Sequence, residues 1–263
     1  MQNGLNCGNL ILLAEYARRA RLGSVLTYGR LFNTLSARDR RKIMRSHGIP
    51  ESVLATRETE GLFAALGADQ VTTLDISDYD CDLLADLMDD FASIEVMRPY
   101  LGRFDTIIDY GTSEHVFNVA QALVNAYNLL ADDGVYIFDL PLSGWVSHCL
   151  YQFTPSYFLS VGASPYFDLT DYFFHRKRGD RIYRITHYNN FSYFWINGRR
   201  RISAWGVLRK VRPDGDERPL TLDRFRVMQV EPRDRNEPRK LSLIGKLGSC
   251  ERYSAATIRR AFD

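Results

Sequence analysis

Residues 104–118, FDTIIDYGTSEHVFN, decide the fold that this chain is predicted to adopt. The first six residues predict a buried strand, because they are mostly apolar or β-branched and contain no proline. The polar loop that follows presents Asp109, Gly111, Glu114 and His115 together. In open α/β sheets, ligands bind at the carboxyl ends of such strands. The stretch therefore predicts where a functional site lies before it indicates which chemistry occurs there.

A helix is predicted directly after this loop. Its apolar residues recur at steps of four and three, which places them on one buried stripe. They are Val116, Ala120, Leu123, Tyr127 and Leu130. Thr112 or Ser113 is expected to cap the helix start, and Glu114 and His115 are expected in its first turn, where the helix dipole favours a carboxylate.

Shorter apolar stretches on both sides of this segment predict further strands. They cover residues 24–27, 70–76, 82–86 and 135–140. Helical segments are expected in the N-terminal part of the chain. They cover residues 9–20, with Gly23 as the stop, residues 36–60 in two pieces with a break, and residues 60–66 with Gly67 as the cap. Strands that alternate with helices imply a parallel sheet with right-handed crossovers.

The chain changes character after Pro141, where aromatic residues become dense. They are Trp145, Tyr151, Phe153, Tyr157, Phe158, Tyr166, Phe167, Tyr172, Phe173 and Phe174. This aromatic content fits a pocket lid and an intersubunit interface equally well. Further elements are expected in this half of the chain. They are strands at residues 181–187 and 202–211, polar loops at 214–219 and 231–239, and a terminal helix at 255–262.

Composition excludes several classes of protein. The 263 residues are 45% hydrophobic and 25% charged, a globular balance, and the net charge of +2 gives no general case for nucleic-acid binding. Two basic clusters, residues 38–45 (RDRRKIMR) and 198–201 (GRRR), are more typical of solvated faces than of an anion site.

The cysteines and the N-terminal region indicate a cytoplasmic protein. The four cysteines are scattered without CxxC spacing, so neither a zinc site nor a disulfide framework is predicted, and a reducing compartment fits best. The apolar run at residues 10–14 is too short to span a bilayer, and no basic segment precedes it as in a signal peptide. We therefore expect no membrane span.

The first strand leads into Tyr28, Gly29 and Arg30, which occupy the first strand-to-helix turn. A glycine there lets the backbone approach a ligand closely, but the GxGxxG fingerprint is absent. Arg30 is suited to pairing with a ligand carboxylate, because its planar fork matches two oxygens. A surface arginine is an equally good interpretation.

Two further acids follow predicted strands. Asp75 ends the second strand, where a carboxylate can accept hydrogen bonds from both hydroxyls of a ribose. The alternative is an acid that only caps its own loop. Asp86 follows the short third strand and is similarly placed to meet an adenine amino group.

His115 is the candidate general base, because the unperturbed pKa of histidine suits proton transfer near neutrality. A helix N-terminus would lower that pKa and keep the ring neutral. The alternative is a histidine that only hydrogen-bonds the turn. His148, Tyr151 and Gln152 follow the fifth strand and are candidates for the substrate side, although a packed aromatic segment explains them equally simply.

At these residues the chain resembles the class I S-adenosylmethionine-dependent methyltransferases, most closely a divergent bacterial branch linked to glycan and surface-polysaccharide pathways. The matching stretches stand in family order and span roughly residues 24–158. They are SVLTYGR (24–30), LGADQVTTLDISDYD (66–80), LLADL (83–87), GRFDTIIDYGTSEHVFN (102–118), LLADDGVYIFDLP (129–141) and HCLYQFTPSYF (148–158).

The resemblance implies an α/β fold with a Rossmann-like, doubly wound and mostly parallel sheet, the class I methyltransferase fold, and an aromatic-rich C-terminal extension. Residues 1–141 would form the cofactor-binding core, and residues 142–263 would complete the sheet and cover the acceptor site. The implied cofactor is S-adenosylmethionine.

The family's roles transfer to matching positions of this chain. Gly29, between Tyr28 and Arg30, would lie by the methionine moiety of the cofactor. Asp75 would hold the ribose, and Ile76, Asp86 and Leu87 would contact the adenine. Asp109, Tyr110 and Gly111 would face the methyl group. Glu114 and His115 would lie beside them as catalytic residues. The family's usual first motif, an acid followed by spaced glycines, is missing here.

Three functions are compatible with these features. The first is methyl transfer to an oxygen or nitrogen of a small or glycan-linked acceptor, by a protein that could act as a homodimer. The second is a non-catalytic methyltransferase-like module that binds a partner protein or a glycan intermediate. The third, an NAD-dependent dehydrogenase, is weaker, because the dinucleotide pyrophosphate depends more strongly on the glycine turn that is missing.

Overall fold

The computed structural model describes residues 4–185, 201–213, 216, 218–228 and 250–262. The predicted loop at 231–239, the end of the strand at 181–187 and part of the loop at 214–219 lie outside these residues. The strands are β1 (Gly4–Leu5), β2 (Gly23–Tyr28), β3 (Phe32–Asn33), β4 (Ala68–Asp75), β5 (Leu83–Leu84), β6 (Phe104–Asp109), β7 (Leu130–Ser143), β8 (Phe167–Arg176), β9 (Ile182–Ile185), β10 (Ile202–Lys210) and β11 (Cys250–Tyr253).

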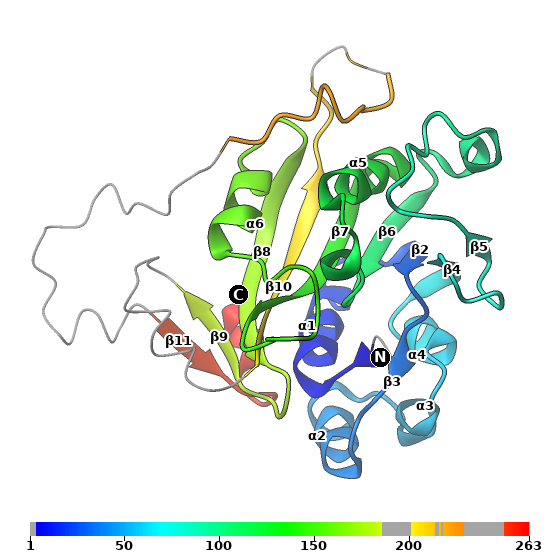
Figure 1. Cartoon of the computed structure of the whole chain (residues 1–263). Coiled ribbons are helices and arrows are strands. Elements are labelled where there is room, and N and C mark those ends of the chain that lie inside the picture. The colour runs from blue at the N-terminus through cyan, green and yellow to red at the C-terminus, as the bar shows by residue number, and fades with distance from the viewer. Residues whose placement is uncertain (1–3, 186–200, 214–215, 217, 229–249, 263) are drawn as a thin grey trace, which may run out of the picture.

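The helices alternate with the strands over the first half of the chain (Figure 1). They are α1 (Cys7–Ala17), α2 (Ala37–His47), α3 (Glu51–Ala55), α4 (Glu60–Ala65), α5 (Val119–Leu129) and α6 (Pro155–Gly162), with 3-10 helices η1 (Glu95–Tyr100), η2 (Ser113–His115) and η3 (Ile258–Ala261). The break predicted between residues 36 and 60 is confirmed, because α2 ends at His47 with Gly48 as its cap, and Pro50 precedes α3.

Most of the described strands form one sheet with the order β11-β9-β8-β10-β7-β6-β2-β4-β5. The neighbours from β5 to β7 all pair in parallel, and β10 is antiparallel to both β7 and β8. Because β8, β9 and β11 also pair antiparallel in turn, only β10 and β9 run against the common direction. The predicted α/β fold with a Rossmann-like, mostly parallel sheet is confirmed.

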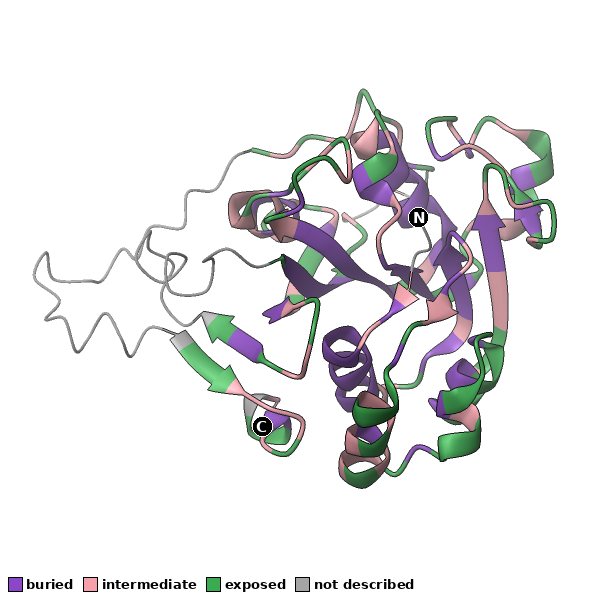
Figure 2. Ribbon diagram, turned by 60° about the horizontal axis from the view of Figure 1, so that its bottom comes forward, coloured by how far each residue is buried: buried purple, intermediate pink, exposed green. Residues whose placement is uncertain are grey.

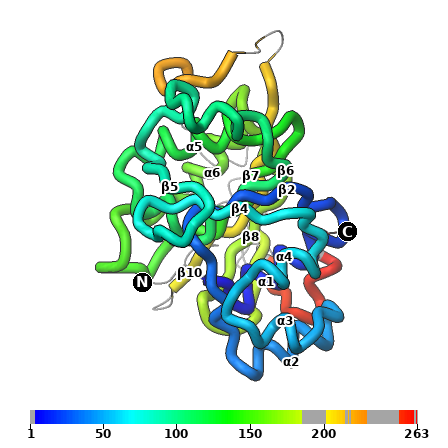
Figure 3. Tube along the Cα trace, turned by 90° about the vertical axis from the view of Figure 1, so that its right-hand side faces the viewer, coloured from blue at the N-terminus to red at the C-terminus, as the bar shows by residue number. Residues whose placement is uncertain are grey.

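The sheet is doubly wound. Helices α1 to α4 lie on one face, and α5 and α6 lie on the other (Figure 3). Each face has its own buried core, one built on Leu10, Phe63 and Ile137, the other on Phe104, Leu123 and Phe138. Figure 2 shows the consequence: the central strands are buried, and exposed residues gather on the outer helices and loops.

Residues before and after Pro141 share this single sheet, because β10 pairs with β7 over most of its length. Many of the aromatic residues after Pro141 fill the cores. Phe138 stacks on Phe158 with ring centroids 4.3 Å apart, and Phe167 and Phe174 are fully buried. The burial of these rings therefore stabilises the C-terminal half of the fold, and this explains them without a role at a surface.

Two predicted helix ends and one helix type are wrong. Helix α1 ends at Ala17 with Arg18 as its cap, and Gly23 instead begins β2 with a φ of 63°. The terminal helix predicted at 255–262 is a short 3-10 helix, η3. The helix predicted directly after Gly111 begins only at Val119, because the Asn118 side chain accepts a hydrogen bond from the backbone N–H of Gln121 and caps it there.

Candidate functional site

Hydrogen bonds join the carboxyl ends of neighbouring strands at one edge of the sheet. The backbone N–H of Gly29, after β2, donates to the Leu74 carbonyl of β4 at 2.7 Å. The Thr112 hydroxyl, after β6, donates to the Tyr28 carbonyl at 2.6 Å. Because β2 lies between β4 and β6, the chain reverses its direction of travel across the sheet at this point. Such a switch point is where open α/β sheets bind ligands.

Two glycine turns flank this switch point. Gly29 follows β2 with a φ of 73°, and Gly111 follows β6 with a φ of 93°. Both values lie in the left-handed region, which side chains with a Cβ atom rarely adopt. The sequence therefore needs glycine at both turns, and both leave backbone groups without side-chain cover beside the switch point.

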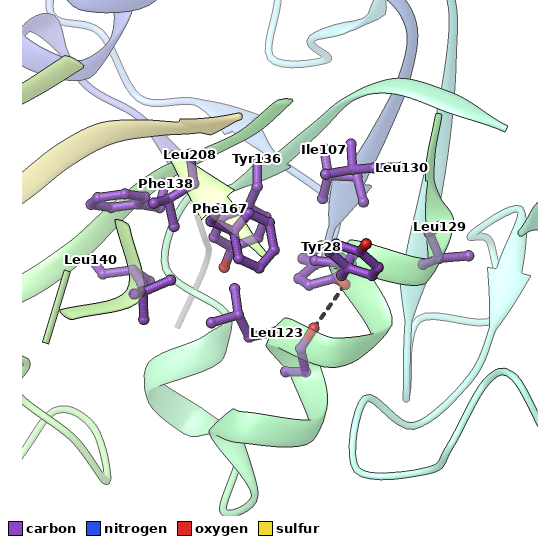
Figure 4. Close-up of a cluster of buried hydrophobic side chains, with 14 of the residues drawn as sticks. Tyr28, Ile107, Leu123, Leu129, Leu130, Tyr136, Phe138, Leu140, Phe167 and Leu208 are labelled. Atoms are coloured by element: carbon purple, nitrogen blue, oxygen red, sulfur yellow. Dashed lines mark hydrogen bonds between the residues drawn. The ribbon is translucent and has the colours of Figure 1, made fainter. Parts of the chain in front are cut away.

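The side chains of Tyr28 and Tyr110 are buried in the core. The Tyr28 hydroxyl donates to the Ala122 carbonyl of α5 at 3.1 Å, an arrangement visible in Figure 4. The Tyr110 hydroxyl accepts a hydrogen bond from the Trp205 indole at 2.9 Å. A contact between either residue and a cofactor would therefore involve its backbone.

Asp109 is likewise fully buried. Its carboxylate accepts hydrogen bonds from the Tyr136 hydroxyl at 2.5 Å and from the backbone N–H groups of Thr112 and Ser113 at 3.0 and 3.3 Å. Burial raises the pKa of Asp109, although these hydrogen bonds act in the opposite direction. The side chain thus orders the loop that carries Gly111.

Asp75 caps its own loop, which is the alternative interpretation from the sequence. Its Oδ1 atom accepts hydrogen bonds from the backbone N–H groups of Ser77 and Asp78 at 2.9 and 3.2 Å. No hydrogen bond from a described residue reaches Oδ2. The neighbouring Ile76 is 60% exposed. One carboxylate oxygen and one apolar side chain therefore remain open to a ligand at the end of β4.

Arg30 bridges two strand ends. Its Nε atom lies 3.0 Å from Oδ2 of Asp78, and its guanidinium also donates to the Asp80 carbonyl. Arg30 thereby ties the loop after β2 to the loop after β4. Its predicted pairing with a ligand carboxylate would compete with these contacts.

The end of β5 lies beside that of β4, because the backbone N–H of Ala85 donates to the Asp75 carbonyl at 3.0 Å. Asp86 caps the next turn by accepting a hydrogen bond from the Met88 N–H at 2.9 Å, and Leu87 is buried. Both predicted adenine contacts therefore flank the same edge as Asp75.

This edge is strongly acidic. Residues 58–97 contain eleven aspartates and glutamates and no lysine or arginine. Five of the aspartates follow β4 or flank β5, and we call them the acidic edge. They are Asp75, Asp78, Asp80, Asp82 and Asp86.

Glu114 is the most unusual titratable group near the switch point. It lies in η2, is only 2% exposed, and its Oε2 atom has no hydrogen-bond partner among the described residues. Burial, followed by the negative charge of Asp109, raises the pKa of Glu114 to about 9. The Glu114 carbonyl accepts the N–H groups of Leu150 and Tyr151 at 3.0 and 3.1 Å, which holds the loop after β7 against η2.

His115 and His148 meet beside this carboxyl group. Their rings make an edge contact with centroids 5.2 Å apart, and His115 Nε2 lies 3.9 Å from Glu114 Oε1. Burial lowers the pKa of both imidazoles. A helix N-terminus does not cause this shift at His115, since α5 begins only at Val119.

Glu114, His115 and His148 also form a set of metal-ligand types. Each offers one ligand atom within 4.8 Å of the others. Carboxylate and imidazole groups together are typical ligands of zinc and of other divalent transition metals. The cysteine pattern indicated no such cluster.

Tyr151 and Gln152, predicted on the substrate side, hold the loop in place. The Tyr151 hydroxyl donates to the Phe117 carbonyl at 2.7 Å, and the Gln152 Oε1 atom accepts the Trp145 backbone N–H at 2.9 Å. Of the three predicted substrate residues, His148 lines a pocket of about 50 Å³ together with Gly111, Glu114 and residues of the C-terminal half.

Several residues of this pocket were not predicted. Trp145 and Lys177 line it, and the Lys177 ammonium lies 4.7 Å from the centre of the Trp145 ring. Asp139, which lies within β7, also lines it. A charged residue inside the apolar stretch VYIFDL was the available signal for Asp139.

Asp139 belongs to a buried network. Its Oδ1 atom accepts a hydrogen bond from His175 Nε2 at 2.7 Å, and its Oδ2 atom accepts one from Asn9 Nδ2 at 2.8 Å. Burial opposes a charge on His175, but the charge and hydrogen bond of Asp139 outweigh it, and the pKa of His175 is raised. Gly8 leaves space for the ring, since a Cβ there would lie 2.4 Å from Nδ1.

Within the described part of the chain, no helix has the length and apolar character needed to cross a bilayer.

Comparison with known proteins finds similarity only at the level of structure. No protein-family model matches this chain, and no curated protein sequence matches it. Among solved structures, it is similar to the 1,6-didemethyltoxoflavin-N1-methyltransferase of Burkholderia thailandensis, which has 1,6-didemethyltoxoflavin and S-adenosylhomocysteine bound. The two are 14% identical, with 77% of this chain and 78% of that chain covered and a TM-score of 0.43.

The N-methyltransferase NodS of Bradyrhizobium japonicum WM9 is another structural neighbour, 9% identical, with 78% of this chain and 94% of that chain covered and a TM-score of 0.42. Its complex with S-adenosylhomocysteine matches over 77% of this chain and 84% of that chain, with a TM-score of 0.40. At these low identities and TM-scores, the likeness concerns the fold alone.

Proposed function

We propose that this chain is an S-adenosylmethionine-dependent methyltransferase that acts on an oxygen or nitrogen of a small or glycan-linked acceptor. The observation that carries this proposal is the pair of left-handed glycine turns, Gly29 and Gly111, on the two sides of the switch point. Asp75 stands beside them with one carboxylate oxygen open. Cytoplasmic location and a homodimer remain predictions from the sequence.

The residues of this edge fit that cofactor. Asp75 is placed to hold the ribose, Asp86 and Leu87 the adenine, and the backbone at Gly29 the methionine moiety. S-adenosylmethionine carries no phosphate, which suits an edge with five aspartates. A dinucleotide pyrophosphate is anionic and would be repelled there, because Arg30 is already paired with Asp78. The dehydrogenase alternative is therefore disfavoured.

The chemistry that the bound cofactor supplies is an electrophilic methyl group. The chain's own contribution is mainly alignment, since holding the reacting groups in line provides much of the rate of a direct displacement. Gly111 and Glu114 line the small pocket beside which the acceptor would meet the methyl group.

His115 and Glu114 would have different roles, one as a proton acceptor and the other as a hydrogen-bond donor. The lowered pKa of His115 keeps its ring neutral at pH 7, so it can accept a proton from a hydroxyl acceptor. Glu114, with a pKa of about 9, carries a proton at that pH. Its carboxyl group can therefore donate a hydrogen bond that positions the acceptor. An amine acceptor that is already nucleophilic would need no base.

Calorimetric titration with S-adenosylhomocysteine, and separately with NAD, tests the proposal. We expect micromolar binding of S-adenosylhomocysteine and a loss of at least about tenfold in Asp75→Ala, because the ribose hydrogen bonds to a charged group are removed. Asp69→Ala is the matched control. Asp69 lies at the opposite end of β4, where it pairs with Arg21 on the surface. Unchanged binding in Asp75→Ala would refute the placement, and binding of NAD instead would refute the cofactor.

The arrangement of Arg30 favours a second candidate function, a non-catalytic module that binds a partner protein or a glycan intermediate. Its contacts with Asp78 and Asp80 close the loops at the position where the family keeps glycines. This candidate predicts that neither ligand binds in the titration and that Asp75→Ala has no effect on partner binding.

A further inference from the structure

Three basic segments that are distant in the sequence line one cleft. The cleft has a volume of about 1110 Å³ and is lined by residues from the start of α2 and from the turn that joins β8 to β9. Its walls carry seven arginines and lysines and two aspartates. Arg38 comes from the first basic cluster of the sequence, Arg201 from the second, and Arg178 from the turn. We call this space the basic cleft.

The two aspartates do not neutralise the basic cleft. Asp180 forms an ion pair with Lys42, with Nζ 3.1 Å from Oδ1. Asp39 accepts a hydrogen bond from the Ser36 hydroxyl at 2.6 Å, at the N-terminus of α2. Arg38 and Arg178 remain exposed, as do Lys177, Arg181 and Arg201, so the cleft keeps a clear excess of positive charge.

The start of α2 strengthens this positive potential. Ser36 caps the eleven-residue helix and lines the basic cleft. The partial positive charge of a helix N-terminus attracts anions, and here it adds to the side-chain charges around it.

Two cations that line the cleft lie against the same aromatic ring. Lys177 Nζ and Arg201 Cζ both lie against the Trp145 ring, at 4.7 and 5.0 Å from its centre. Cation–π contacts hold each side chain in place, but the two like charges repel each other. An anion between or beside them would relieve that repulsion.

The basic cleft adjoins the candidate site. Lys177 and Asn6 line both the cleft and the small pocket that contains Glu114 and His148. A ligand whose anionic part occupied the cleft could therefore extend its neutral part toward Glu114.

We propose that the basic cleft binds a phosphate ester and that the acceptor of the methyl group carries this phosphate. The identification of the ligand as the acceptor rests on the proposed function, whereas anion binding does not. Arginine forks bind phosphate oxygens in pairs, and the volume of the cleft accommodates more than a single phosphate. Sugar phosphates and sugar nucleotides both have the required chemistry.

Calorimetry with the full-length chain tests the proposal, using inorganic pyrophosphate, glucose 1-phosphate and uridine diphosphate as probes and glucose as the neutral control. We expect the phosphates to bind and glucose not to bind. Arg38→Glu and Arg178→Glu should each weaken pyrophosphate binding by at least about tenfold. Tighter binding of glucose 1-phosphate or of uridine diphosphate would identify the source of the phosphate, and either supports the proposal.

Arg103→Glu is the matched control, because Arg103 is exposed just before β6, makes the same change in net charge and does not line the basic cleft. It lies at the start of its strand, at the opposite edge of the sheet from the end of β8, and we expect less than about a threefold effect from it, as for a remote exposed charge. Equal losses in Arg38→Glu and Arg103→Glu would show non-specific attraction and overturn the proposal. Absence of pyrophosphate binding, or equally tight binding of a single-stranded oligonucleotide, would also overturn it.

Titration of the same variants with S-adenosylhomocysteine separates the two proposals. Arg38→Glu should keep its affinity for that ligand. If the wild-type protein binds S-adenosylhomocysteine but not pyrophosphate, only the proposal for the basic cleft is overturned. The reverse result would overturn the methyltransferase, and with it the identification of the ligand as the acceptor, but would leave phosphate binding by the basic cleft in place.

Discussion

The acidic edge and the basic cleft carry opposite charges, and they are built in different ways. The aspartates of the acidic edge come from one short stretch of chain that follows β4 and flanks β5. The charges of the basic cleft come from α2, from the end of β8 and the turn after it, and from Arg201 just before β10. The contrast suits a cofactor without phosphate on one side and an anionic acceptor on the other, with Glu114 and His148 in the pocket that adjoins the cleft.

The two regions also differ in what holds them in place. Backbone hydrogen bonds between strand ends order the acidic edge, such as the one from Gly29 to Leu74. The turn that joins β8 to β9, which lines the basic cleft, directly follows the end of β8. A buried hydrogen-bonded pair, His175 with Asp139, holds that end of the strand in place. The basic cleft should therefore be the more sensitive of the two to a single substitution in the core.

Asp139→Asn should have the largest effect on stability. Breaking a buried ion pair on one side costs about 3–5 kcal/mol of unfolding free energy. Because the folded-state pKa of His175 is raised above its ordinary value of 6.5, the pair's contribution is fully present below pH 6.5 and is lost as the pH rises through the raised value. Urea unfolding at pH 6 measures the loss.

Asp168→Asn is the control for this substitution, since the ion pair of Asp168 with Arg209 is about half exposed and should contribute less than about 1 kcal/mol. If Asp139→Asn lowered the free energy of unfolding no more than Asp168→Asn, the pair of Asp139 with His175 would not hold the end of β8. Other contacts would then hold the turn between β8 and β9.

Glu114→Gln should change how stability depends on pH. The pKa of Glu114 rises from 4.5 to about 9 on folding, so the folded state keeps a proton that the unfolded state releases in this range. Stability should therefore fall as the pH rises from 4.5 to 9, by roughly 1 kcal/mol per pH unit, and glutamine should remove this slope. Thermal unfolding at pH 5 and pH 8 measures it. A variant with the wild-type slope would show that Glu114 is ionised in the folded protein.

Arg30→Ala should have the smallest effect. Its ion pair with Asp78 is about 30% exposed, and such pairs contribute about 1 kcal/mol or less. Affinity for S-adenosylhomocysteine should change by less than about threefold, since the Arg30 guanidinium already contacts Asp78 and Asp80 of the acidic edge. Arg21→Ala, at the opposite end of β4, is the control. A tenfold loss of affinity in Arg30→Ala alone would show that Arg30 leaves Asp78 and binds a ligand carboxylate.

Strands were predictable where the apolar pattern was continuous. The predicted strand at residues 104–109 matches β6, and the stretch at 135–140 lies within β7. The start of α5 was not predictable from that pattern. Val116 fits the apolar stripe but precedes the helix, because η2 and the Asn118 cap use the backbone groups of this segment differently.

The candidate site was predictable in position and only partly in content. Asp75, Gly29 and Gly111 lie at one edge because parallel strands all end on the same side of a sheet. The buried and hydrogen-bonded states of Asp109 and Tyr28 were not predictable, since they depend on Tyr136 and Ala122 in other elements.

The sequence by itself determined the strand-and-helix alternation, the acidic character of residues 58–97 and the loop that carries Gly111 and Glu114, because each depends on neighbours in the chain. Only the tertiary structure decided that Arg38 and Arg201 line one cleft, that Asp139 forms a hydrogen bond with His175 and that Glu114 is buried. Charge placement and burial depend on which elements pack together, and sheet order, not local sequence, sets that packing.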